Sequence, residues 1–128
     1  MGFEKLMFAF VDQPELLHEI NRDLLDFNLR LLEQITAVCV PTFMTIAEDM
    51  SYNNGPMISR RLMDEFMAPY YKQLLVRAKE MEMLTIVDTD GDVTLLVPWL
   101  LENGIEGVLP MEGAGVGRTG QAAHPRHQ

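Results

Sequence analysis

The chain has 128 residues, of which 48% are hydrophobic, and this is enough for one domain with a core of its own. Nineteen acidic against ten basic residues give a formal charge of −9, which disfavours nucleic acids and anionic membranes as partners. No apolar run approaches the roughly 20 residues of a membrane span, and the N-terminus lacks the features of a signal peptide. The single cysteine, Cys39, fits a reducing compartment, so we expect a cytoplasmic protein in which Cys39 is a small buried residue.

Two helices are expected at the start of the chain. Apolar residues at helical spacing predict a first helix over 3–11. Pro14 suits the first turn of a second helix, with Asp12 as its cap. Apolar residues then recur every three or four positions, and charged residues occupy the other face. This pattern predicts a long amphipathic helix over 14–35.

The chain changes character after this helix. The β-rich stretch "AVCVPTFMTIAED" predicts a strand over 42–47, and "SYNNGP" after it is dense in turn-forming residues. Ser59 is expected to cap a helix over 59–82, which Pro69 should kink or split. The run "LTIVD", 84–88, predicts a short buried strand.

The last predicted elements are one helix and one strand. Asp92 is expected to cap a helix over 93–103 that ends at Gly104, and a third strand follows over 105–112. Strands separated by helices predict right-handed crossovers and a parallel sheet, and therefore the α/β class. The glycine-rich remainder, 113–128, is expected to be a disordered tail.

The stretch "TIVDTDGDV", 85–93, contains three aspartates but does not match a helix–loop–helix calcium loop. Counted from Asp88, glycine is the fourth residue and the twelfth is Trp99 rather than glutamate. We interpret Asp88 as the strand end and Gly91 as the turn, with Asp92 as the helix cap. Asp88 and Asp90 are left without a structural role, which makes them candidates for a functional site.

Acidic residues follow all three predicted strands. Glu48 and Asp49 follow the first, Asp88 and Asp90 the second, and Glu112 the third. The carboxyl ends of parallel strands meet at one edge, where α/β proteins bind ligands, so five carboxylates are expected at a common mouth. There they could hold a proton as a general acid, or bind a cation or a basic substrate group. The alternative is that polar residues simply collect where strands meet solvent.

Several segments in order resemble the uroporphyrinogen decarboxylase superfamily: "EDMSYNNGPMIS", "EFMAPYYKQL" and "VDTDGDVTLLVPWLLENGIEGVLPME". The resemblance covers about residues 2–112 and implies a (β/α)8 barrel with its site at the carboxyl ends of the strands. Such barrels need about 250 residues, so this chain would supply only part of one. We therefore expect a partial barrel over 1–112, with about three parallel strands and long amphipathic helices.

The resemblance also implies an activity. The superfamily includes decarboxylases of a cyclic tetrapyrrole and zinc-dependent methyltransferases that serve corrinoid proteins. The histidine and cysteine zinc ligands of the methyltransferases correspond to Asp88 and Asp90 here, so no metal or cofactor is favoured and zinc stays the open alternative. We expect a carbon–carbon lyase acting on a tetrapyrrole or a related small molecule. The expected site comprises the catalytic residues Asp88, Asp90 and Asp49 and the substrate-binding residues Glu48, Ser51, Tyr52 and Glu112.

Two alternatives remain open. One is a methyltransferase-like protein that acts with a corrinoid protein as its partner. The other is an inactive barrel fragment or assembly module, which would associate through open sheet edges. Zinc content would distinguish the first alternative, and the size of the molecule in solution would distinguish the second.

Overall fold

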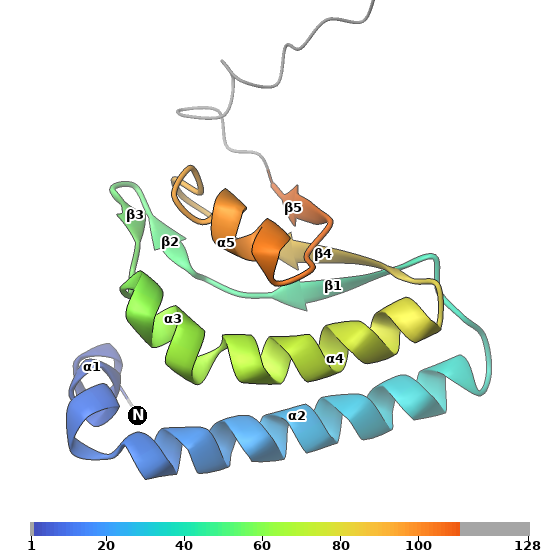
Figure 1. Ribbon diagram of the computed structural model, residues 1–128, viewed down its shortest axis with the longest axis horizontal. Coiled ribbons are helices and arrows are strands. Elements are labelled where there is room, and N and C mark those ends of the chain that lie inside the picture. The colour runs from blue at the N-terminus through green and yellow to red at the C-terminus, as the bar shows by residue number, and fades with distance from the viewer. Residues whose placement is uncertain (1, 111–128) are drawn as a thin grey trace, which may run out of the picture.

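The structure is a computed structural model, and it describes residues 2–110 (Figure 1). A pair of helices comes first, and helices and short strands then alternate along the chain. The elements in order are α1 (Phe3–Asp12), α2 (Pro14–Thr36), β1 (Phe43–Ala47), β2 (Ser51–Tyr52), β3 (Gly55–Pro56), α3 (Arg60–Phe66), α4 (Ala68–Glu80), β4 (Leu84–Asp88), α5 (Val97–Glu102) and β5 (Gly107–Leu109).

A parallel sheet with the strand order β1-β4-β5 forms the centre of the fold. Ala47, Asp88 and Leu109 lie in register across it. The predicted α/β class with short parallel strands is therefore confirmed. Strand β5 is shorter than the predicted 105–112, because Ile105 is buried in the helix-side core and pairing begins only at residue 107. Glu112 and the predicted tail, 113–128, lie outside the described residues.

The described helices cover one face of this sheet. Ile46, Val87 and Val108 pack into the same core as residues of α4 and α5. The side chains that alternate with them lie on the other face, where Phe43, Leu84 and Leu109 are 53%, 49% and 47% exposed. Helix α4 lies between α2 and the sheet (Figure 1). The fold is thus layered, with helices on one side of the sheet and an open face on the other.

The predicted break at Pro69 is confirmed. The helical segment divides into α3 and α4, and the proline lies in the first turn of α4. A proline has no backbone N–H, and the first turn of a helix is the one place where that donor has no partner to lose. Ser59 caps α3, because its hydroxyl accepts a hydrogen bond from Leu62 N at 3.4 Å.

Other boundaries differ from the prediction. Helix α5 begins at Val97 rather than at 93, because Asp92 caps a preceding turn by accepting a hydrogen bond from Thr94 N at 2.9 Å. Pro98 consequently lies in the first turn of α5. The assignment of Asp12 as the cap of α2 is wrong, since Asp12 is the last residue of α1 and Gln13 precedes α2. The β2–β3 hairpin was not predicted.

The expectation that Cys39 is buried is also wrong. Cys39 is exposed in the connection between α2 and β1. Its neighbours Val38 and Val40 are 87% and 57% exposed, so this apolar stretch runs over the surface rather than through the core.

Trp99 links three helices of the core. The residue is fully buried, and its indole N–H donates a hydrogen bond to Asp64 Oδ1 at 2.7 Å. This bond is the main reason why the pKa of Asp64 lies below its usual value. The indole ring also packs against Tyr71, with 5.9 Å between the ring centroids. One side chain of α5 therefore connects α3 and α4.

We expect Trp99→Ala to lower the free energy of unfolding by about 3–5 kcal/mol, because it leaves a large cavity and removes one hydrogen-bond donor to Asp64. Urea unfolding measures the change. Leu101→Ala, two residues away on the same helix but 62% exposed, is the matched control and should cost less than about 1 kcal/mol. Equal losses in the two variants would contradict the role given to Trp99.

Candidate functional site

The carboxyl ends of the three parallel strands lie side by side, where the sequence placed the candidate site. Glu48 N donates a hydrogen bond to the Asp88 carbonyl at 2.8 Å, just beyond the last paired residues of β1 and β4. Thr89 N in turn donates to the Leu109 carbonyl at 2.7 Å. The backbone thus brings together two of the three predicted acidic positions, the third being outside the described residues.

The side chains of Glu48 and Asp88 nevertheless lie on opposite faces of the sheet. Ala47 is paired in register with Asp88 and shares its face, so Glu48, one residue later, points the other way. Asp88 is exposed on the open face. Glu48 is partly buried on the helix-covered face, next to Tyr71 of α4. The expectation that both carboxylates face one mouth is therefore wrong.

The remaining predicted acids are exposed in loops. Asp49 directly follows Glu48, and Asp90 lies in the loop after β4. Within residues 2–110, no side chain or backbone group forms a hydrogen bond with the carboxylate of Asp49, Asp88 or Asp90. No group of three or more histidine, cysteine, aspartate or glutamate residues is arranged to hold a metal ion in this part of the chain.

Hydrogen bonds tie the loop after β1 to the loop after β4. Ser51 is buried, and its hydroxyl donates to the Asp92 carbonyl at 2.9 Å. Asp92 N donates to the Tyr52 carbonyl at 3.1 Å, and Met50 N donates to Thr89 Oγ1 at 3.0 Å. Ser51, predicted to bind substrate, therefore has a structural bond in this state. The Tyr52 side chain is 65% exposed and free to contact a ligand.

Gly91 is required where these two loops meet. Its φ angle is +82°, a conformation that side chains disfavour. A Cβ atom at this position would lie only 2.8 Å from the Tyr52 carbonyl oxygen. Glycine thus permits both the turn and the close approach of the two backbones.

Gly91→Ala should lower the free energy of unfolding by about 2–4 kcal/mol, because it combines backbone strain with a clash. Gly104→Ala is the matched control, since its φ is +93° but its nearest contact is Leu75 Cδ1 at 3.9 Å. That variant should cost only about 1–2 kcal/mol of strain. Thermal or urea unfolding compares them, and a Gly104→Ala loss equal to that of Gly91→Ala would show that the loops do not meet closely.

A hollow of about 380 Å³ lies beside Glu48. Apolar residues of α1, α2 and α3 form most of its wall, and Tyr71 lies at the end near Glu48. The Tyr71 hydroxyl is buried without a hydrogen-bond partner of good geometry in the described residues. The sequence analysis did not single out this tyrosine. The available signal was its helical spacing with Leu75 and Ala78, which places all three on the buried side of α4.

Burial raises the pKa of the Glu48 carboxyl above its usual value. The Tyr71 hydroxyl opposes this effect and the negative charge of Asp49 adds to it. Burial and the Glu48 charge likewise raise the pKa of Tyr71. The pair can therefore hold a proton in an apolar setting, which is a property that acid–base sites use.

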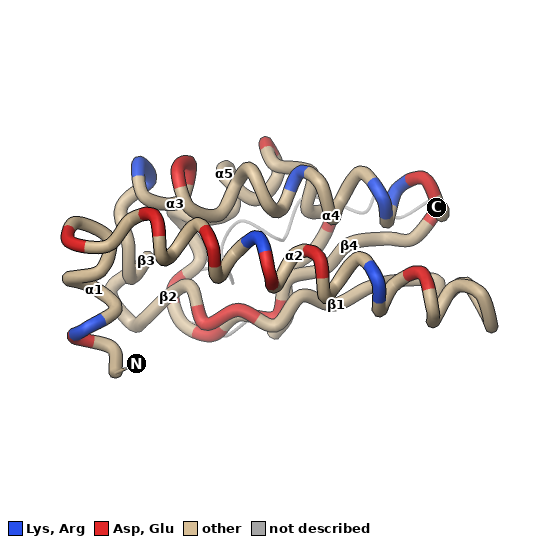
Figure 2. Tube along the Cα trace, turned by 90° about the horizontal axis from the view of Figure 1, so that it is seen from below, with Lys and Arg blue, Asp and Glu red and all other residues tan. Residues whose placement is uncertain are grey.

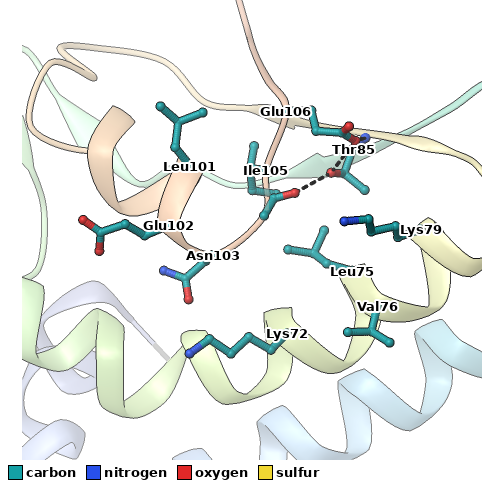
Figure 3. Close-up of a pocket in the computed structure, with 11 residues that line it drawn as sticks. Lys72, Leu75, Val76, Lys79, Thr85, Leu101, Glu102, Asn103, Ile105 and Glu106 are labelled. Carbon is teal, nitrogen blue, oxygen red and sulfur yellow. Dashed lines mark hydrogen bonds between the residues drawn. The ribbon is translucent and has the colours of Figure 1, made fainter.

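Two further hollows lie elsewhere in the fold. One, of about 530 Å³, runs between α2 and β1 and is also lined by Glu48. The other, of about 590 Å³, lies between α4 and the end of α5, with Lys72 and Lys79 on the α4 side (Figure 3). There Glu106 accepts a hydrogen bond from Thr85 N at 3.0 Å, near the start of β4 and away from the acidic strand ends. Asp88 and Asp90 line none of these three hollows.

Glu48→Gln should make the stability of the protein less dependent on pH. A carboxyl whose pKa is raised by folding contributes most to stability below the unfolded pKa and loses this contribution as the pH rises through the folded pKa. The stability of the variant relative to the unchanged protein should therefore increase as the pH rises above 4.5, the usual pKa of this carboxyl, as measured by urea unfolding. In an Asp49→Asn background the increase should shrink, because one cause of the raised pKa is gone. A difference that stays constant with pH would contradict the burial of Glu48.

No described helix is long and apolar enough to cross a membrane. Comparison of the chain with family models, with curated proteins and with solved structures found no match.

Proposed function

We propose that the chain forms part of a uroporphyrinogen decarboxylase-like barrel and that its open sheet face contributes to the substrate site. The support is the arrangement of the layers: parallel strands in the order β1-β4-β5, with all covering helices on one face. In a (β/α)8 barrel the helices lie outside and the other face of the sheet turns inward. The open face would then be the inner wall of the barrel.

Asp88 is the residue on this face that is best placed for chemistry. It is exposed at the carboxyl end of the central strand β4, where barrel enzymes carry their reactive groups. In a decarboxylation, the bond to the carboxylate breaks, carbon dioxide leaves, and the carbon takes up a proton. We assign to Asp88 the positioning of the substrate and the transfer of this proton, and to the exposed Asp90 and Asp49 contacts at the same edge.

The structure changes the proposed roles of the other residues. Glu48 lies on the helix-covered face and is therefore no longer assigned to the substrate. The exposed ring of Tyr52 remains a substrate contact in this proposal. The net charge of −9 disfavours a substrate with many carboxylates, so a related substrate with fewer acidic groups fits better. An exposed, unpaired Cys39 fits the cytoplasm as the proposed location.

The proposal is tested by incubating the purified protein with uroporphyrinogen and with its less carboxylated derivatives, and by following carboxyl loss by chromatography. Asp88→Asn should reduce turnover by about 10²-fold or more, as loss of an acid–base group does. Glu15→Gln, an exposed acid in the first turn of α2, is the control and should leave turnover unchanged. Absence of turnover with every substrate would overturn the activity, and full turnover by Asp88→Asn would overturn the site. Tightly bound stoichiometric zinc would favour the methyltransferase reading instead.

A second candidate function is that of an assembly module without activity of its own. The observation that favours it is the open sheet face, where three large apolar side chains are about half exposed, together with the outer edge of β1, which has no strand paired to it in the described part of the chain. Exposed edges and apolar faces attract partners. Stable association through the open face or the β1 edge, without turnover, would support this reading.

A further inference from the structure

Helix α2 carries a stripe of large apolar side chains that the rest of residues 2–110 leaves partly exposed. It runs along one flank of the helix, and each of its members is between 38% and 58% exposed. We call this set the α2 stripe, and it consists of Leu16, Ile20, Leu24, Phe27, Leu31 and Ile35.

The stripe is offset from the side of α2 that packs on the fold. Leu17 and Leu32, the buried residues of α2, contact the clusters formed with Phe66 and with Ala78. At 100° per residue, the stripe is centred about 80°, less than a quarter of a turn, away from these two. A helix usually needs one apolar face to join its own fold, so a second apolar flank of this length indicates a second contact.

The spacing of the stripe is symmetric along the helix. About the midpoint between residues 25 and 26, Leu16 mirrors Ile35, Ile20 mirrors Leu31, and Leu24 mirrors Phe27. The four central positions follow the three- and four-residue spacing of a coiled-coil seam. Under a two-fold axis through this midpoint, two copies of α2 pair in antiparallel fashion, and every apolar residue of the stripe lies opposite an apolar residue.

The charges beside the stripe fit the same axis. Asp23 and Arg30 lie two helical turns apart, on the same border of the stripe. The helix rises 1.5 Å per residue. Under the two-fold axis, Asp23 of one copy and Arg30 of the other are therefore separated by only about 3 Å along the helix direction. Arg30 also pairs with Asp26 on its own helix at 2.7 Å, and both side chains are exposed, so the guanidinium keeps donors free. Figure 2, seen from the α2 side, shows both signs of charge along this helix.

The surface beside the stripe offers room for a partner helix. Ile20 and Leu24 line the hollow of about 380 Å³ near one end of α2, and Leu31 and Ile35 line the hollow of about 530 Å³ near the other. Under the two-fold axis, the hollow of about 380 Å³ in each copy faces the hollow of about 530 Å³ in its partner. At a rise of 1.5 Å per residue, the α2 stripe is roughly 30 Å long. This length suits an interface of about 1,000 Å², the area that a specific contact needs.

We propose that the protein forms a two-fold symmetric homodimer through antiparallel pairing of the α2 stripes, with Asp23 of each copy facing Arg30 of the other. This inference does not depend on the proposed activity, because the stripe lies on the helical side and Asp88 on the open sheet face.

Sedimentation velocity of the purified protein at concentrations up to about 100 µM and 150 mM salt tests the dimer. The unchanged protein should sediment as a dimer at the upper concentrations. The double variant Leu24→Glu/Phe27→Glu, at the centre of the stripe, should sediment as a monomer and keep its helical circular dichroism. The matched control Val76→Glu/Leu101→Glu places the same charges at residues 58% and 62% exposed on other helices, and should remain dimeric.

Charge variants test the register without touching the apolar contact. Asp23→Lys should raise the dissociation constant by about two- to thirty-fold, because two exposed ion pairs become repulsive. The double variant Asp23→Lys/Arg30→Glu should recover most of the loss, since it exchanges the two charges. A monomeric unchanged protein would overturn the proposal. A dimer unaffected by Leu24→Glu/Phe27→Glu, or a charge exchange without recovery, would overturn it as well.

Discussion

The packing of α4 is the constraint on which the rest of the structure depends. Its residues Tyr71 and Leu75 join the core beneath the parallel sheet, whereas Ala78, fully buried, meets Leu32 of α2. Because α4 lies between α2 and the sheet, the helices accumulate on one side and the other face of the sheet stays open (Figure 1). The half-buried setting of Glu48 and the exposure of Asp88 both follow from this asymmetry.

The sequence predicted those parts of the fold that depend on long periodic patterns. The spacing of apolar residues located α1, α2 and the α3–α4 pair, and the two apolar runs located β1 and β4, because burial repeats every few residues there. The β2–β3 hairpin could not be found in this way. It has two-residue strands and rests on backbone bonds such as that from Met57 N to the Met50 carbonyl, which leave no side-chain pattern. The start of α5 was misplaced because Asp92 caps a turn rather than the helix itself.

The candidate site was predictable in position but not in orientation. Parallel pairing of β1 with β4 places the backbones of Glu48 and Asp88 next to each other across the sheet, and this follows from topology alone. Which face each side chain occupies depends on the alternation within each strand, so an offset of one residue reverses the result. The contact of Glu48 with Tyr71 also depends on α4, a distant element whose placement a single sequence does not specify.

The alternation along β1 has a consequence for how such a surface could change. Deletion of one residue within this strand would carry the Glu48 carboxyl from the helix layer to the opposite face, beside Asp88. Two carboxyls at that separation share protons, and one of them becomes a stronger base than it is alone. Deletion of a single codon would thus create a new proton-transfer pair on this surface. It would also lower the stability of the fold, because apolar residues of β1 would leave the core.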